Sequence, residues 1–112
     1  MGYSRAVVAG PHVFVSGTAP IAAEGGDPPA DAYGQARLCL QLVLEALERA
    51  GASAADVVRT RMFLTDAADM DEIGRAHAEV FGELRPASSA LVVKALLDPR
   101  WRIEIEADAL IA

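Results

Sequence analysis

The length, composition and charge of the chain narrow the possibilities before any motif is considered. A chain of 112 residues, 53% of them hydrophobic, has enough apolar side chains for one core, which excludes two-domain mechanisms and a disordered chain. Ten basic residues against sixteen acidic ones give a net charge of −6, which disfavours binding to nucleic acid.

The cysteine count and the N-terminal sequence bear on the compartment. Cys39 is the single cysteine, so the chain can form neither an internal disulfide nor a cysteine metal cage. The N-terminus has no basic segment followed by an apolar one, and no uncharged apolar run approaches the ~20 residues that span a bilayer. We therefore expect a cytoplasmic protein without membrane contact.

The first thirty residues predict a β-hairpin and a surface loop. Residues 3–9 read as a strand that stops at a Gly-Pro pair, and residues 12–16 form a second apolar run. Residues 22–30 contain two glycines and two prolines with almost no bulky side chain, which is loop composition.

Residues 31–50 predict the first helix. Apolar side chains recur there at helical spacing, and Gly51 follows at a position where glycine ends many helices. Cys39 lies within the apolar stripe, so we expect a small buried side chain rather than a nucleophile.

Residues 56–64 and 69–81 predict a strand and the second helix. The first segment is rich in β-branched and long side chains, and Asp69 with Glu72 makes an acidic capping box at the start of the second. Asp69 is thus the expected N-cap. His77 falls on the apolar side of this helix, where we expect a packing histidine rather than a catalytic one.

Residues 88–95 and 101–111 predict the last two strands. In the final strand, Ile103, Ile105, Ala107, Ala109 and Ile111 point one way, and Arg102, Glu104, Glu106 and Asp108 point the other way. The order β-β-α-β-α-β-β indicates an α+β fold with the helices on one face of a mixed sheet. Because strand 88–95 is apolar on both sides, we expect it to be buried on both, with another subunit as the simplest cover.

The acidic row of the final strand is the strongest chemical feature. Residues two apart project to one face about 6.6 to 6.8 Å from each other, so Glu104, Glu106 and Asp108 can raise one another's pKa. A carboxylate of this kind can act as a general base or hold a water. The alternative, which the residues alone favour, is a structural ladder of ion pairs with Arg59 and Arg61.

Other chemical templates are missing. The sequence has no phosphate-binding or dinucleotide glycine pattern and no metal-ligand spacing, and Ser16 lacks the strand-turn-helix setting of a nucleophile elbow. No basic patch with interleaved aromatic residues is present. We predict no cofactor, no metal and no nucleic acid partner.

Seven short motifs run in order through nearly the whole chain. They are Tyr3-Ser4-Arg5-Ala6-Val7, Phe14-Val15-Ser16-Gly17 with Pro20, Gln35-Ala36-Arg37, Asp56-Val57-Val58-Arg59-Thr60 with Phe63-Leu64-Thr65-Asp66, Phe81-Gly82-Glu83, Arg85-Pro86-Ala87 and Ile103-Glu104-Ile105-Glu106-Ala107. Together they resemble the YjgF/RidA (endoribonuclease L-PSP) family over about residues 2–111.

This resemblance implies a fold and an activity. It implies that residues 1–112 form one chorismate-mutase-like domain, assembled as a homotrimer whose sheets line a central barrel and whose ligand clefts lie between subunits. The best-known members hydrolyse reactive enamines and imines, such as 2-aminoacrylate and its imine, to a 2-oxo acid and ammonia. In those members an arginine after Pro-Ala clamps the substrate carboxylate, and the first glutamate of the I-E-I-E strand holds the attacking water.

The resemblance also assigns site residues. Tyr3, Ser16 and Glu104 match family cleft positions, whereas Gly74, Ser88 and Ala90 stand where those members have an asparagine, the arginine and a cysteine or threonine-like residue. One extra residue separates Ser88 from Glu104. The pattern resembles the subgroup that lacks the arginine, which matters because arginine binds a carboxylate through two charge-assisted hydrogen bonds and serine offers one neutral donor.

Three functions remain open at this point. The first is hydrolysis of a small imine or enamine with altered substrate recognition, with Glu104 as the catalytic residue. The second is a trimeric binding protein for a small metabolite, and the distant third is an endoribonuclease, which the net charge disfavours.

Overall fold

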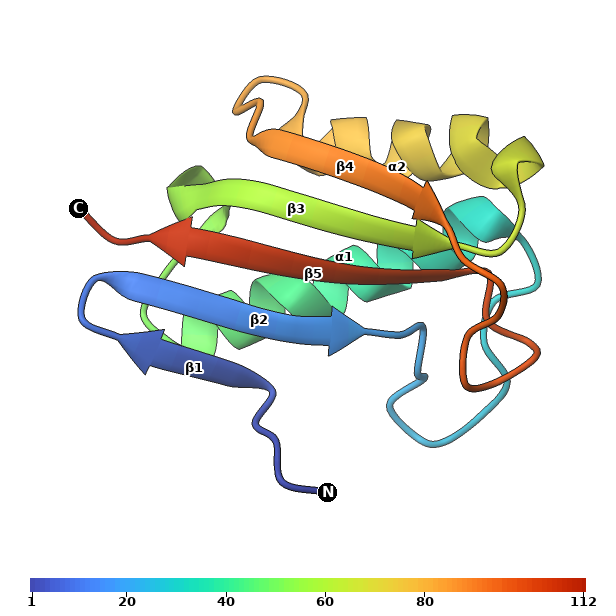
Figure 1. The fold of residues 1–112 in the computed structure, drawn as a ribbon, viewed down its shortest axis with the longest axis horizontal. Coiled ribbons are helices and arrows are strands. Elements are labelled where there is room, and N and C mark those ends of the chain that lie inside the picture. Colours follow the sequence, from blue (N-terminus) through green and yellow to red (C-terminus); the bar gives the residue numbers. More distant parts are fainter.

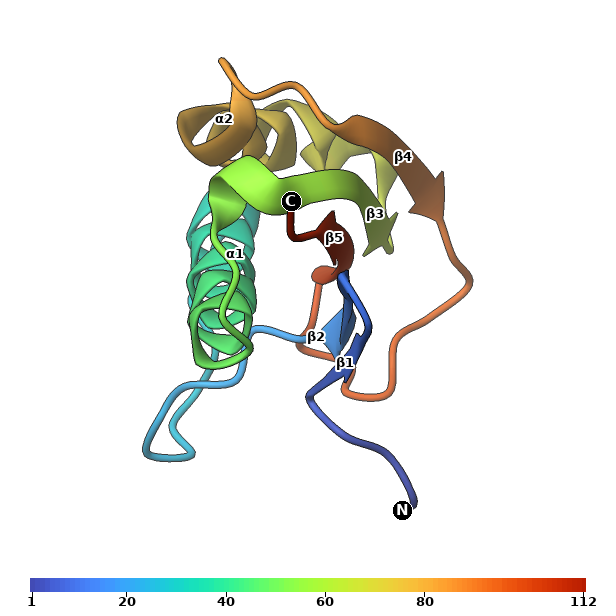
Figure 2. The ribbon, with the colours of Figure 1, turned by 90° about the vertical axis from the view of Figure 1, so that its left-hand side faces the viewer.

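The protein folds as a five-stranded sheet with two helices packed on one of its faces (Figure 1, Figure 2). The computed structural model describes residues 1–112. The strands are β1 (Ala6–Ala9), β2 (His12–Thr18), β3 (Val57–Leu64), β4 (Ala87–Val92) and β5 (Ile103–Leu110), the helices are α1 (Ala32–Arg49) and α2 (Met70–Phe81), and two short 3₁₀ helices are η1 (Ala54–Asp56) and η2 (Ala67–Asp69). The predicted α+β class is confirmed.

The strand order in the sheet is β1-β2-β5-β3-β4. All neighbouring pairs are antiparallel except β3 and β4, which are parallel. A parallel pair needs a crossover connection, and α2 supplies it between these two strands. This crossover places α2 beside β4, at the edge of the sheet (Figure 1).

The core lies between the sheet and the helices. The alternation predicted for β5 is confirmed over residues 103–109, because Ile103, Ile105, Ala107 and Ala109 are buried beneath α1 and the acidic residues between them lie on the opposite, open face. The residues with no more than 1% of their surface exposed include Val13, Cys39, Leu40, Val43, Leu47, Ile73, Phe81, Ile103, Ile105 and Ala107. Figure 2 shows both helices on one side of the sheet and none on the other.

The first helix has the termini that its sequence predicts. The side chain of Asp31 accepts a hydrogen bond from the Gly34 amide at 3.0 Å, which caps the N-terminus. Gly51 follows the helix with a φ of +86°, a left-handed conformation that favours glycine.

Asp69 precedes α2 at the N-cap position, as predicted, but its side chain does not make the predicted capping hydrogen bond. The chain enters α2 through η2, so Asp66 caps the turn by accepting from the Ala68 amide at 2.9 Å. Asp69 already has helical backbone angles, and its side chain makes no capping bond. It is buried instead and pairs with Arg102, whose Nη1 lies 3.1 Å from Oδ1 of Asp69.

The structure also corrects the strand predicted for residues 88–95. The strand β4 runs over residues 87–92, and all six residues are exposed in the single chain. The reason is its place at the sheet edge, with β3 as its one neighbour. Several large apolar side chains of the strands are likewise exposed: Val7, Val8, Phe14, Val58, Leu91, Val92 and Leu110. A second copy of the chain as their cover stays a prediction.

Candidate functional site

Glu104 lies on the open face of the sheet, in the central strand β5. Its neighbour across β3 is Phe63, and on the β2 side its carboxylate lies against Gly17. A Cβ atom at Gly17 would stand 3.0 Å from Oε2 of Glu104, so the glycine leaves the room that the carboxylate occupies. Burial, and secondarily the charge of Glu106, raises the pKa of Glu104 above its ordinary value.

The rest of the acidic row forms the ion pairs that the sequence suggested as an alternative. One guanidinium nitrogen of Arg61 lies 3.2 Å from Oε1 of Glu106 and 3.2 Å from Oδ2 of Asp108. Arg59 takes part in no ion pair, and Glu104 has neither an ion pair nor a hydrogen bond through its side chain. The ladder therefore accounts for two of the three carboxylates and leaves Glu104 unpaired.

Ser16 and Tyr3 lie on the β1–β2 side of the sheet. The Ser16 hydroxyl donates to the carbonyl of Ser4 at 2.6 Å, and the Ser16 amide donates to the carbonyl of Arg5 at 3.0 Å. These bonds hold the N-terminal segment along β2, the strand that carries Gly17. The side chain of Tyr3 is 67% exposed and makes no hydrogen bond within the chain.

Ser88 and Ala90 lie on the helix side of the sheet. In the parallel register they stand beside Thr60 and Met62, which are both buried under the helices. Gly74 lies in the first half of α2, the helix beside this strand. The sheet therefore separates Ser88, Ala90 and Gly74 from the carboxylate of Glu104 on the open face.

A single chain does not enclose a site around these six residues. No cavity of the chain is lined by Tyr3, Ser16, Gly74, Ser88, Ala90 or Glu104. A cleft that contains both Ser88 and Glu104 has to combine the helix side of one chain with the open face of another.

The side chains of Ser88, Thr60 and His77 form a hydrogen-bonded chain. Oγ of Ser88 and Oγ1 of Thr60 are 2.9 Å apart, and Oγ1 of Thr60 and Nε2 of His77 are also 2.9 Å apart. The His77 ring packs against Phe81 with centroids 4.9 Å apart, and burial lowers its pKa. Packing was predicted for His77, whereas its link to Ser88 was missed, because no sequence spacing connects positions 60, 77 and 88.

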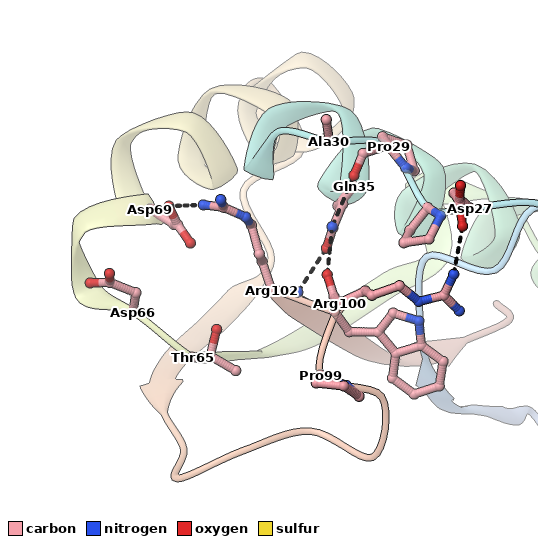
Figure 3. Close-up of a pocket in the computed structure, with 12 residues that line it drawn as sticks. Asp27, Pro29, Ala30, Gln35, Thr65, Asp66, Asp69, Pro99, Arg100 and Arg102 are labelled. Carbon is pink, nitrogen blue, oxygen red and sulfur yellow. Dashed lines mark hydrogen bonds and ion pairs between the residues drawn. The ribbon is translucent and has the colours of Figure 1, made fainter.

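A separate polar cavity of about 610 Å³ lies where three loops meet at one end of the sheet (Figure 3). The Gln35 amide crosses it, donating to the carbonyls of Pro29 and Arg100 and accepting from the amide of Arg102 at 2.7 Å. Arg100 pairs with Asp27 at 2.8 Å across the same cavity. These bonds tie the loops together. The polar Gln35 within an apolar helix stripe was the sequence signal for this cluster.

The structure has neither a metal-binding cluster nor a membrane-spanning helix. No group of three or more histidine, cysteine, aspartate or glutamate side chains is arranged to hold a metal ion. Neither helix has the length and apolar character needed to cross a membrane.

Comparison with known proteins supplies the family. The family model described as endoribonuclease L-PSP matches residues 1–111. TdcF of Escherichia coli K12, named as a reactive intermediate deaminase, is 36% identical over 110 residues, which cover 96% of this chain and 84% of TdcF.

Solved structures agree with this match. The crystal structure of E. coli TdcF with bound serine has a TM-score of 0.93 at 33% identity, covering 100% of this chain and 90% of that one. Rv2704 from Mycobacterium tuberculosis, a member of the YjgF/YER057c/UK114 family, has a TM-score of 0.89 at 44% identity, covering 98% and 87% of the two chains. The chain belongs to the YjgF/RidA family, the endoribonuclease L-PSP family.

Proposed function

We propose that the protein hydrolyses a small reactive imine or enamine to a carbonyl compound and ammonia, in clefts between the chains of a homotrimer. The observation that carries the proposal is the state of Glu104. Its carboxylate is unpaired and partly buried and has a raised pKa, while Arg61 forms ion pairs with both other members of the row. A raised pKa makes a carboxylate a stronger base than an ordinary one, which suits proton abstraction from a water.

The chemistry requires only the substrate and one water. Glu104 holds the water and takes its proton while the water oxygen bonds to the imine carbon, and the electron pair of the C=N bond moves to nitrogen. The protonated Glu104 returns that proton to the nitrogen, and the resulting carbinolamine collapses to the carbonyl product and ammonia. The proposal therefore involves no cofactor and no metal.

Ser88 alters which substrate the cleft accepts. An arginine at this position offers a carboxylate two parallel charge-assisted hydrogen bonds, whereas serine offers a single hydroxyl. We propose that the chain belongs to the arginine-lacking subgroup and that its substrate has no carboxylate, or is bound through another group. In this cleft Tyr3, Ser16, Gly74 and Ala90 contribute to the walls.

A non-catalytic binding protein is the second candidate. Two departures from the family pattern favour it. Ser88 and Gly74 are smaller than the arginine and the asparagine that the family has at these positions, so two groups that could anchor a substrate are absent. Ribonuclease activity ranks well behind both, since a net charge of −6 repels a phosphate backbone.

Two substitutions separate the enzyme from the binding protein. The imine of 2-aminoacrylate is generated in the assay, and formation of 2-oxo acid is followed for wild type, Ser88→Arg and Ser88→Arg with Glu104→Gln. We expect slow hydrolysis by wild type, faster hydrolysis by Ser88→Arg, and loss of about 10² to 10⁴-fold when glutamine replaces the general base. The matched control is Ser88→Arg with Asp108→Asn, which removes another carboxylate of the same row. We expect this variant to keep the faster hydrolysis of Ser88→Arg.

A specific outcome decides against hydrolysis. If Ser88→Arg binds pyruvate or 2-oxobutanoate by calorimetry but shows no turnover that depends on Glu104, the protein is a binding protein. The glutamate is then part of the structural acidic row.

A further inference from the structure

The three side chains Ser88, Thr60 and His77 leave little freedom for their protons. Thr60 is 0% exposed, and its hydroxyl has two partners, Oγ of Ser88 and Nε2 of His77, each at 2.9 Å. Ser88 is exposed at the sheet edge, so its remaining bonding capacity faces outward. Thr60 therefore transmits the state of the histidine ring to a surface serine.

Only two proton arrangements satisfy this chain. A hydroxyl has one proton and two lone pairs, and the buried Thr60 hydroxyl has no acceptor within reach other than these two partners, so Thr60 donates to one of them and accepts from the other. In the first arrangement Ser88 donates to Thr60 and Thr60 donates to the lone pair of Nε2 of His77. In the second, Nε2–H donates to Thr60, Thr60 donates to Ser88, and the Ser88 proton is free to point outward.

The surroundings of His77 favour the first arrangement. Burial lowers the pKa of His77, and no ion pair of the chain includes this residue, so the ring is neutral at neutral pH. The lone pair of a neutral imidazole is a more basic acceptor than a hydroxyl oxygen. The hydroxyl proton of Thr60 therefore points to Nε2, which fixes the proton of Ser88 in turn.

We propose that Thr60 and His77 are positioning residues that turn the Ser88 proton inward, so that Ser88 presents oxygen lone pairs and selects an amide or amine N–H over a carboxylate. The inference rests on the proposed function only in placing Ser88 in the ligand cleft. It gives Ser88 a different recognition role from that of an arginine at the same position. Arginine presents only donors, whereas Ser88 presents an acceptor, and an acceptor opposite a carboxylate oxygen leaves both without a hydrogen bond.

The tautomer of His77 is the first test and needs no ligand. Long-range ¹H–¹⁵N correlation spectra of the labelled full chain report which ring nitrogen carries the proton, and the exposed His12 serves as the internal reference. At neutral pH we expect the proton on Nδ1 of His77 and a hydrogen-bonded lone pair on Nε2. Thr60→Val, which keeps the shape and removes the hydroxyl, abolishes that preference, whereas Thr60→Ser retains it. A proton on Nε2 in the wild type overturns the proposal.

Ligand selection is the second test. Pyruvamide and pyruvate differ by an amide in place of a carboxylate, and calorimetry measures their Kd ratio for each variant. We expect wild type to favour pyruvamide by about 10-fold, since a carboxylate oxygen opposite the Ser88 lone pairs leaves both groups without a hydrogen bond. Ser88→Ala and His77→Phe bring the ratio close to one, and His12→Phe, the control, leaves it unchanged.

The two proposals fail in different ways. An unchanged ratio in folded His77→Phe and Thr60→Val overturns the positioning role, whatever the turnover. Absent turnover with the expected ratio and tautomer overturns the hydrolase proposal alone. If neither compound binds, the position of the His77 proton decides.

Discussion

Two ionisable side chains on opposite sides of the sheet, Glu104 on the open face and Cys39 in the core, both have a raised pKa. Glu104 is in β5, and Cys39 is in α1, which packs against that strand. Burial is the main cause of the raised pKa in both side chains. Cys39 has no exposed surface, and its thiol donates to the carbonyl of Ile103 at 3.8 Å, so it is unreactive packing, as predicted. Glu104 remains partly accessible, so its raised pKa can serve proton transfer.

The state of Glu104 has a cost in stability that can be measured. A carboxyl whose pKa is higher in the folded chain binds more protons there, so stability falls as pH rises through and above its ordinary value of 4.5. We expect Glu104→Gln to raise the urea midpoint at neutral pH and to lose this advantage by about pH 4. Asp108→Asn, which loses its contact with Arg61, lowers the midpoint at neutral pH. A Glu104→Gln variant no more stable than wild type at neutral pH contradicts the assignment.

At the scale of elements, the entry into α2 assigns separate tasks to two aspartates one turn apart. Asp66 caps η2, and Asp69 anchors the turn to Arg102 at the start of β5. The carboxylate of Asp69 is buried while the Arg102 side chain is 46% exposed, so the pair joins the helix entry to the sheet at the margin of the polar cavity (Figure 3). The two residues therefore stabilise the same junction by different contacts.

Double-mutant cycles distinguish these tasks. Asp66→Ala should cost about 0.5 to 2 kcal/mol of unfolding free energy through an unpaired amide, and Asp66→Asn should cost little because asparagine also caps. Asp69→Ala and Arg102→Met should each destabilise and combine non-additively, since they remove the same contact. Asp66→Ala with Arg102→Met should be additive. Coupling between Asp66 and Arg102 instead of Asp69 and Arg102 shows that the contacts were assigned to the wrong residues.

At the scale of the whole molecule, one face of the sheet has helices and the other has none. The open face and the edge strand β4 expose large apolar side chains, among them Phe14 and Leu91. Large exposed apolar side chains gathered on one face are typical of surfaces that a partner covers, which favours a second copy of the chain there. The proposed cleft also needs both faces, because Ser88 and Glu104 lie on different sides of the sheet.

Assembly is tested by sedimentation equilibrium at micromolar concentration. We expect a species of three times the 11.8 kDa chain mass. Leu91→Asp puts a charge on the edge strand and should shift the mass toward the monomer, whereas Gln41→Asp adds the same charge to the exposed surface of α1 and should not. A wild-type species at the monomer mass excludes both the trimer and a cleft between subunits.

Much of the fold was predictable because it depends on local sequence patterns. The helix over residues 31–50 follows from apolar spacing and a C-terminal glycine, and β5 follows from strict alternation, both of which the structure confirms. Ordered motifs over most of the chain were enough to predict the family. These signals are read within a few residues or along a single segment, so no knowledge of tertiary contacts was needed.

The tertiary structure decided what depends on contacts between distant segments. The register of β3 against β5 gives Arg61 to Glu106 and Asp108 and leaves Glu104 unpaired, a choice that the residues alone left open. The edge position of β4 exposes a strand whose composition predicted burial. The packing of α2 against the sheet brings His77 to Thr60, and the pairing of β3 with β4 brings Thr60 to Ser88. Register against a distant strand, edge position and helix docking depend on which segments pair and pack in three dimensions, and the pattern of a single segment does not specify its partner.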